Sequence, residues 1–199
     1  MNIIWHGHSC FEITGKDGTI VFDPYQANSV PGLNSLKLKA NLVLCSHEHD
    51  DHNARNCVEV APKDFKVTCI ETYHDHHQGS HRGKNTIHIV DFEDLKVVHM
   101  GDIGCMMDDI SKLKNCDVLM IPIGGYYTID TKEALKYIEH IQPRIVIPMH
   151  YCSHEFGYDV LSTNEGFIQK SSNIVYVDDY LEVHKETKGQ TIVFKKPRN

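Results

Sequence analysis

The segment Cys45-Ser46-His47-Glu48-His49-Asp50-Asp51-His52 decides the fold and chemistry of this chain. It directly follows Asn41–Cys45, an apolar run that predicts a buried strand, so it lies where α/β proteins build their sites. Two imidazoles two positions apart on an extended loop can converge on one ion, and the following aspartate and histidine can turn toward a second. Imidazole nitrogen and carboxylate oxygen suit zinc at about 2.0–2.2 Å, and also iron or manganese. The segment therefore predicts a metal site built from its three histidines and Asp51.

Three further residues that can bind metals follow other expected strands. His74 comes just after Val67–Tyr73, Asp102 follows Lys96–Met100 in a Gly-Asp turn, and His150 follows Arg144–Pro148. One such residue alone would be read as a hydrogen-bonded or surface side chain. The repetition at four strand ends favours ligands instead. The chain has 15 histidines, more than two ions require. His76, His77 and His81 lie close to His74 in the sequence, so any one of these histidines could be the ligand from this loop.

Periodicity predicts an α/β (α+β) chain with a mixed sheet, or two sheets with helices outside. Short apolar, β-branched runs predict the strands Ile3–Trp5, Phe11–Thr14, Thr19–Phe22, Asn41–Cys45, Val67–Glu71, Thr86–Asp91, Lys96–Met100, Val118–Ile123 and Arg144–Pro148. Apolar residues at three-to-four spacing predict the helices Met106–Lys114, Thr131–Ile141 and Thr163–Ser171. We expect Asp130 or Thr131 to cap the second helix and Pro143 to end it.

Composition limits the class of protein. The 199 residues fit one domain, 1–199, with 41% hydrophobic and 24% charged residues, as in globular proteins. A net charge of −7 argues against a nucleic-acid binder that works through bulk basic attraction. No apolar run approaches the ~20 residues of a membrane span, and Met1–His6 does not read as a signal peptide. We therefore expect a cytoplasmic protein.

The seven cysteines are an odd number, and none forms a Cys-x-x-Cys pair. Several lie in apolar runs, as Cys45 does. We therefore expect the cysteines to be buried, reduced and packed as small apolar side chains, rather than to form disulfides or bind metal as thiolates.

The order His-x-His-x-Asp-His, a lone His, a Gly-Asp turn and a late His resembles the metallo-β-lactamase superfamily over almost the whole chain. Trp5-His6-Gly7-His8-Ser9-Cys10-Phe11 and Arg82-Gly83-Lys84-Asn85-Thr86 carry a narrower likeness. They are similar to small bacterial proteins related to ascorbate-6-phosphate lactonase and, more distantly, to N-acyl-phosphatidylethanolamine phospholipase D. The resemblance implies a four-layer αββα sandwich with the metal site at one edge of the sheets.

The resemblance also implies a ligand set for two divalent ions, with Zn²⁺ favoured and Mn²⁺ or Fe²⁺ as alternatives. The first ion would be held by His47, His49 and His74, the second by Asp51, His52 and His150, and Asp102 would bridge them. Asp23 matches a position that supports the metal loop and is not a ligand. The diiron oxidoreductase branch has Glu where this chain has His49, which argues against electron transfer to oxygen.

These ligands predict a hydrolase of the lactonase or phosphodiesterase type, which uses a metal-bound hydroxide on an ester, lactone or phosphodiester bond. Two divalent ions, two aspartates and one hydroxide leave the site at about +1, which suits a small anionic substrate. Asp51 could relay a proton to the leaving group. Arg82 and Lys84 could orient an anion, although a solvated loop is an equal reading.

Three aromatic residues complete the expected substrate-binding set. His8 is expected to reach the cleft or to satisfy a buried hydrogen bond, and Tyr126 and Tyr127 to line the pocket or pack at its rim. Specificity is expected in the loops 24–40, 75–85 and 151–162.

Two rival functions remain open from the sequence. One is a non-catalytic metal-binding or sensor protein on the same fold, because ligands alone do not establish turnover. The other is an all-helical His-Asp phosphohydrolase, suggested by His49-Asp50 and His74-Asp75, which needs both pairs on helices. A homo-oligomer is also left open.

Overall fold

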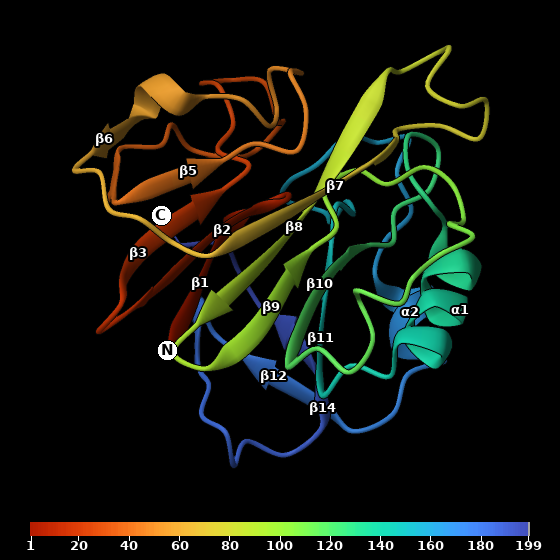
Figure 1. The fold of residues 1–199 in the computed structure, drawn as a ribbon. Coiled ribbons are helices and arrows are strands. Elements are labelled where there is room, and N and C mark those ends of the chain that lie inside the picture. The colour runs from red at the N-terminus through yellow and green to blue at the C-terminus, as the bar shows by residue number, and fades with distance from the viewer. Residues whose placement is uncertain (199) are drawn as a thin grey trace.

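Two facing β-sheets carry most of the chain in the computed structural model, which describes residues 1–198 (Figure 1). The five-stranded sheet has the order β13-β1-β2-β3-β5. Its strands are β1 (Asn2–Gly7), β2 (Cys10–Gly15), β3 (Gly18–Phe22), β5 (Leu42–Leu44) and β13 (Tyr180–Glu182). The seven-stranded sheet has the order β12-β14-β11-β10-β9-β8-β7. Its strands are β7 (Val67–Tyr73), β8 (Lys84–Phe92), β9 (Leu95–His99), β10 (Val118–Pro122), β11 (Ile145–Met149), β12 (Ile174–Val177) and β14 (Gln190–Phe194).

The main core lies between the two sheets, where alternate side chains of each strand point inward. Phe11, Ile13, Ile20 and Phe22 face this core from β2 and β3 and are fully buried. Every residue of β10 and β11 is buried, which confirms that these apolar runs are strands covered on both faces.

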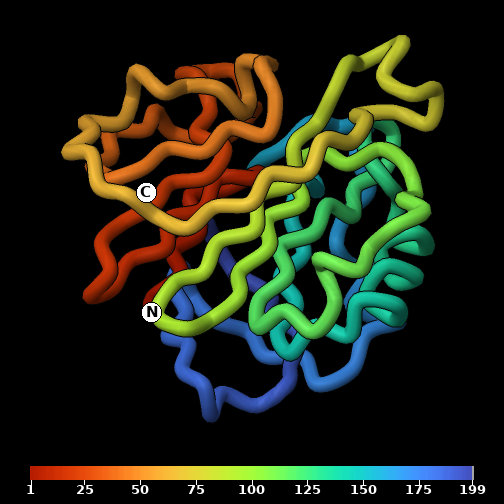
Figure 2. Tube along the Cα trace, viewed as in Figure 1, coloured from red at the N-terminus to blue at the C-terminus, as the bar shows by residue number. Residues whose placement is uncertain are grey.

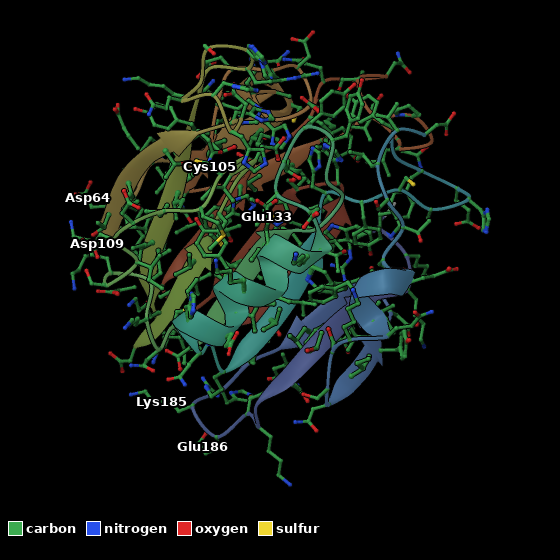
Figure 3. All side chains as sticks on the ribbon, turned by 90° about the vertical axis from the view of Figure 1, so that its right-hand side faces the viewer. Asp64, Cys105, Asp109, Glu133, Lys185 and Glu186 are labelled. Carbon is green, nitrogen blue, oxygen red and sulfur yellow. The ribbon has the colours of Figure 1, made fainter. Side chains whose placement is uncertain are left out.

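One long helix covers the outer face of the seven-stranded sheet. Helix α1 (Thr131–Ile141) packs through Ala134, Tyr137 and Ile141 (Figures 1 and 3). Asp130 caps it, and a reciprocal bond from the Asp130 backbone to Glu133 completes a capping box that was not predicted. Gln142 ends it in the left-handed conformation, one residue before Pro143.

The outer face of the five-stranded sheet is covered by the segment 24–66 rather than by an α-helix (Figure 2). This segment contains β4 (Leu38–Ala40) and β6 (Val58–Val60), which form a two-stranded parallel sheet, and the short 3-10 helix η1 (Arg55–Cys57). It buries Tyr25 and Val30 against Cys10 and Val21, on the strand faces opposite the main core. The αββα sandwich is thus confirmed, with one outer layer made mainly of irregular structure.

Two helix predictions need correction. Residues 106–114 form bends and turns, because the Asp109 carboxylate accepts a hydrogen bond from the Ser111 amide and stabilises a turn in place of a helix. Ile110 and Leu113 still pack on the core, which explains their helix-like spacing. The expected helix at 163–171 is reduced to α2 (Glu165–Ile168), which contains the unfavourable Gly166.

Other predictions have mixed outcomes. The structure adds the unpredicted strands β4, β6, β12, β13 and β14, and its many strands exclude the all-helical alternative. Cys10 and Cys116 are buried as expected, whereas Cys69 is exposed, and all seven cysteines are free. Within residues 1–198, no helix is both long and apolar enough to cross a bilayer.

Candidate metal centre

Six strands deliver side chains to one edge of the sandwich. Strands β1, β3 and β5 run parallel in one sheet, as do β7, β9 and β11 in the other, so their carboxyl ends gather at this edge. The loops after them carry, in chain order, His8, Asp23, His47–His52, His74, Asp102 and His150. The edge was predicted from four of these strand ends.

Asp102 is the centre of the cluster. Its Oδ2 atom lies 2.9 Å from His150 Nε2, 3.2 Å from His52 Nε2 and 3.3 Å from His74 Nε2. His47 Nε2 is 4.0 Å away. One carboxylate therefore touches histidines from both expected ligand groups, as a bridge between two ions requires.

The candidate ligands form two compact groups, joined by a third that consists of His47, His52 and Asp102. His47, His49 and His74 form the first, and His52, His150, Asp51 and His8 form the second. In each group one nitrogen or oxygen atom per residue lies within 4.8 Å of the others. All ligands expected from the sequence are therefore brought together, and His8 joins them.

Hydrogen bonds on the far side of the rings aim the Nε2 atoms into the cluster. His74 Nδ1 donates to the Tyr127 carbonyl (2.9 Å), and His47 Nδ1 bonds the Ser46 hydroxyl (2.9 Å). Asp23 accepts from His52 Nδ1 (2.8 Å) and from the Ser46 amide and hydroxyl. Fixing Nδ1 as the protonated nitrogen leaves Nε2 free to bind a metal. Asp23 thus occupies the supporting position expected for it.

The backbone of the edge is strained where it must turn sharply. His8, Asp23 and His150 have φ values of 53°, 43° and 52°, a region that non-glycine residues seldom adopt. Gly101, with φ 55°, precedes Asp102, and a Cβ there would lie 2.4 Å from the Ser46 Cβ and the Asn85 Oδ1. Asn85 Oδ1 accepts a hydrogen bond from the Asp102 amide at 2.8 Å, so the close approach at Gly101 holds the backbone of Asp102 in place.

The electrostatics keep the carboxylates ionised and divide the imidazoles. Burial disfavours the charge of Asp102, but His150 and His52 outweigh it and hold its pKa well below its usual range. Burial also opposes the charge of Asp51, yet His52 and His8 lower its pKa. Burial lowers the pKa of His47 to about 3 and also lowers the pKa of His49. At His52 and His74, in contrast, Asp102 outweighs burial and raises the pKa of both. Ionised carboxylates and neutral imidazoles are the forms that bind divalent ions.

The chemistry of the cluster fits divalent metal ions. Within residues 1–198, His47 Nε2, His52 Nε2 and Asp102 Oδ1 are buried without a hydrogen-bond partner. Each such atom costs about 1–3 kcal/mol if left unpaired. All three point to the shared centre, and coordination removes this cost. The nitrogen and oxygen ligand set suits Zn²⁺, Mn²⁺ or Fe²⁺.

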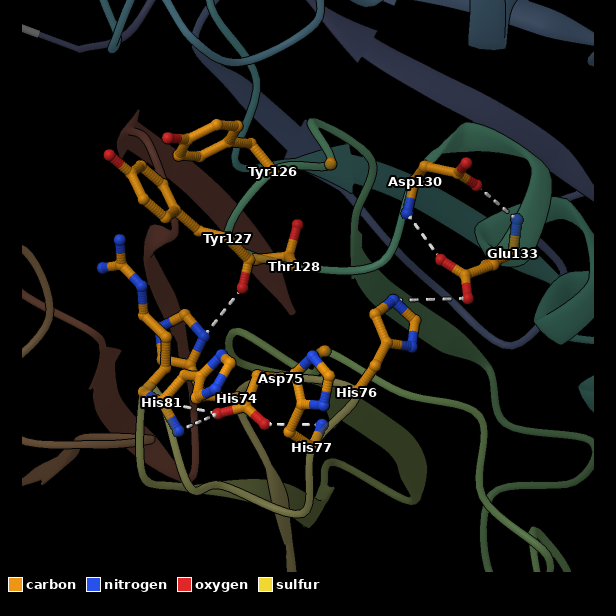
Figure 4. Close-up of a pocket in the computed structure, with 13 residues that line it drawn as sticks. His74, Asp75, His76, His77, His81, Tyr126, Tyr127, Thr128, Asp130 and Glu133 are labelled. Carbon is orange, nitrogen blue, oxygen red and sulfur yellow. Dashed lines mark hydrogen bonds and ion pairs between the residues drawn. The ribbon is translucent and has the colours of Figure 1, made fainter.

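A cavity of about 330 Å³ opens onto the centre, and a second of about 440 Å³ adjoins it (Figure 4). His74, Arg82 and Tyr127 line both. The Arg82 guanidinium stacks 3.8 Å from the centre of the Tyr127 ring, between the two chambers. Arg82 is therefore the cation next to the metal cavity, and Tyr126 reaches only the second chamber.

Two substrate-binding predictions are corrected by these positions. Lys84 lines neither cavity, because it lies on β8 and pairs with Glu71 at 3.0 Å. His8 is fully buried beneath the metal cavity and lines neither chamber, so a substrate in them does not touch it.

Sequence reasoning missed Tyr158, whose hydroxyl is 3.2 Å from Asp51 Oδ2 and which lines the metal cavity. The only signal for Tyr158 was its place in the loop 151–162. It also missed Asn85 and Ser46, although both lie in segments whose likeness to known proteins was noted.

Comparisons with known proteins agree with this geometry. A sequence model of the beta-lactamase superfamily domain matches residues 2–150. A UPF0173 metal-dependent hydrolase of Thermoplasma acidophilum is 30% identical in an alignment of 189 positions that covers 76% of this chain and 83% of that protein. A relative with the same description in Natranaerobius thermophilus is also 30% identical, with the same coverage.

Solved structures show the same fold. The crystal structure of a proposed Zn-dependent hydrolase of the metallo-beta-lactamase superfamily from Thermotoga maritima has a TM-score of 0.77 and 27% identity, over 97% of both chains. A metallo hydrolase from Ignicoccus hospitalis has a TM-score of 0.61 at 20% identity, over 85% of this chain and 89% of that one, and shows likeness of fold alone.

Proposed function

This chain belongs to the beta-lactamase superfamily, and we propose that it is a metal-dependent hydrolase that cleaves an ester, lactone or phosphodiester bond of a small anionic substrate. The observation that carries the proposal is the meeting of imidazoles from both ligand groups at the Asp102 carboxylate, beside an open cavity. Relatives named metal-dependent hydrolases support the reaction class.

Two ions fit the ligand groups. His47, His49 and His74 would hold the first, and Asp51, His52 and His150 the second, with Asp102 shared. When bound, two divalent ions supply a hydroxide near neutral pH and stabilise the negative charge that develops in the transition state.

Asp51 is the residue proposed to move a proton. Its side chain is 16% exposed and lines the metal cavity. Its Oδ2 atom lies 3.2 Å from the Tyr158 hydroxyl, which can hold the carboxylate in place or exchange a proton with it. A carboxylate so placed can pass a proton to the leaving group.

An anionic substrate is supported by Arg82. Its guanidinium lies over Tyr127, so its long side chain is fixed beside the metal cavity and needs little ordering when an anion binds. The acidic net charge of −7 does not oppose this, since the local field at the centre is set by the ions and Arg82.

The free cysteines support a reducing compartment, the cytoplasm, as the place of this activity.

The test is hydrolysis of a substrate panel by the purified, metal-loaded protein. Lactones and thioesters, each in a charged and a neutral form, would be compared with phosphodiesters and phosphomonoesters, which are anionic at neutral pH, with Asp102→Ala as the inactive reference. We expect turnover of at least one charged ester, lactone or phosphodiester that Asp102→Ala lacks. Tight binding of two ions without turnover of any member would instead support the metal-binding or sensor alternative.

A further inference from the structure

His8 lies at the metal centre but outside the ligand set that the family resemblance implies. It follows β1 at an irregular point of the β1–β2 pairing, where Gly7 pairs with Cys10 and the register shifts. Gly7 and His8 both have positive φ, 106° and 53°. A histidine seldom adopts this backbone conformation, and such residues gather at functional sites. The turn places a side chain with no solvent exposure beneath the metal cavity.

The two ring nitrogens of His8 are buried, and within residues 1–198 neither has a hydrogen-bond partner. The buried structural histidines differ. His99 Nε2 bonds the Ser9 carbonyl at 3.0 Å, and His88 Nε2 bonds the Cys45 carbonyl at 3.2 Å. Buried polar atoms in native proteins are rarely left unpaired. Apart from the Asp51 carboxylate, whose Oδ2 atom lies 3.3 Å from Nε2, His8 therefore lacks a polar partner among residues 1–198, and a partner from outside the polypeptide would satisfy it.

The surroundings of His8 indicate what that partner is. Its Nε2 lies 3.3 Å from Asp51 Oδ2, and its ring centre lies 4.2 Å from that of His150 and 5.2 Å from that of His52. One ligand atom from each of these four residues lies within 4.8 Å of the others. Ligand atoms held at about 2.0–2.2 Å from one ion are about 3.0–4.4 Å apart, so these four atoms already lie close to the span of a single coordination sphere.

We propose that His8 is an additional ligand of the second metal ion. This deepens the proposed hydrolase function and rests on the same metal centre. The two sites then differ: the first ion has His47, His49, His74 and the shared Asp102, a four-ligand set that suits zinc. The second has three imidazoles, from His8, His52 and His150, and two carboxylates.

Five protein ligands would already exceed the tetrahedral number that zinc prefers. They approach the six-coordinate sets adopted by Mn²⁺, Fe²⁺ or Co²⁺. The second site therefore selects such an ion over zinc more strongly than the first site does.

The test uses the full-length protein loaded with two equivalents of Co²⁺. Unpaired electrons of cobalt shift the ring N–H proton resonances of ligating imidazoles far outside the normal range, so NMR counts the ligating histidines directly. We expect six shifted resonances, three for each ion. Five would come from His47, His49, His52, His74 and His150.

Variants assign the sixth resonance. His8→Ala should show five resonances and a Kd for the second Co²⁺ raised more than about 100-fold, beyond the effect of a residue that only supports a ligand. The Kd of the first ion should change by less than about threefold. Tyr158→Phe, which removes the hydroxyl 3.2 Å from Asp51 Oδ2, should keep six resonances, so loss of an Asp51 contact alone would not explain the change. Thermal unfolding of each metal-free variant checks the fold.

Two outcomes would overturn the proposal in distinguishable ways. Five resonances in the wild-type protein with two bound Co²⁺, or six that persist in His8→Ala, would refute the role of His8 and leave the hydrolase proposal intact. Failure of the wild-type protein to bind Co²⁺ would refute both. Should His8→Ala fail to fold, the number of shifted resonances in the wild-type protein still decides whether a sixth histidine binds Co²⁺.

Discussion

Two histidine-rich regions lie next to each other at the edge of the sandwich, and within residues 1–198 only the first gathers its ring nitrogens around a shared carboxylate. In the ligand cluster, His47, His52, His74 and His150 are buried and their Nε2 atoms surround Asp102. In the loop 75–82, His76, His77 and His81 are solvent-accessible. His77 and His81 stack on each other at 4.3 Å, and His76 lies 3.7 Å from Glu133 (Figure 4).

The two regions also use their aspartates differently. Asp102 presents an oxygen to imidazoles, whereas Asp75 accepts hydrogen bonds from four backbone amides of its own loop, those of His77, Gly79, His81 and Arg82. Asp75 therefore shapes a loop, and Asp102 organises ligands. The same residue types become a metal site only where strand ends bury them around a shared carboxylate.

Removing the central carboxylate should have the largest effect. Asp102→Ala deletes the contact shared by both groups, so we expect loss of bound metal and a fall in kcat/KM of at least about 1000-fold, or about 4 kcal/mol. Elemental analysis and hydrolysis assays measure both. Asp75→Asn, its counterpart in the loop, should keep two ions. Undiminished metal in Asp102→Ala would contradict its bridging position.

Substitutions of the histidines in the two regions should have clearly different effects on metal affinity. His74→Ala should weaken the first ion by at least about 100-fold, since a lost ligand costs more than a lost supporting partner. Replacing His76, His77 and His81 together by Gln should change the Kd of either ion less than about threefold. Isothermal titration with Zn²⁺ compares the two proteins. Weaker metal binding in the triple variant would show that the loop 75–82 contains a ligand, so that the two regions would not differ in function.

A supporting residue should have an intermediate effect. Asp23→Asn keeps the size of the side chain but removes the charge that orients His52 and Ser46. We expect metal affinity to fall about 10–100-fold, chiefly at the second ion, to which His52 belongs. Chelator competition gives the value for each site. An effect as large as that of Asp102→Ala would instead make Asp23 a ligand.

The smallest effect is expected at the rim of the cleft. Arg82→Gln should raise KM for an anionic substrate about tenfold, the value of one charge-assisted hydrogen bond, and leave a neutral analogue unchanged. Lys84→Gln is the matched control, because Lys84 pairs with Glu71 outside the cleft. Steady-state kinetics gives the KM of both variants for the charged and the neutral substrate. Equal effects on charged and neutral substrates would show that Arg82 only stabilises the loop.

The main layers and the ligand set could be predicted from the sequence because both depend on local signals. Continuous apolar runs such as Val118–Pro122 are buried strands, and polar residues directly after them fall at one edge. The C-terminal strands could not be found in this way. β14 pairs with β11 and β12 across many residues, and its place depends on nonlocal packing.

The features of the site that could not be predicted from the sequence also depend on nonlocal structure. The segment around Lys84 shows charge near His74, but only the antiparallel pairing of β7 and β8 reveals that Lys84 opposes Tyr73 and reaches Glu71. The position of His8 depends on a left-handed turn at the end of β1, for which the sequence signal is a single glycine, Gly7. Tyr158 reaches Asp51 across more than one hundred residues of chain.

Metal stoichiometry coupled to activity tests the central claim most directly. Wild-type protein saturated with Zn²⁺ or Mn²⁺ and freed of excess metal should contain two ions per chain by elemental analysis. Hydrolysis of the best substrate should be lost after chelation and should return as the second equivalent is added back. Hydrolysis that survives complete removal of metal, or a saturated protein that holds one ion per chain or fewer, would contradict a dinuclear centre at the Asp102 edge.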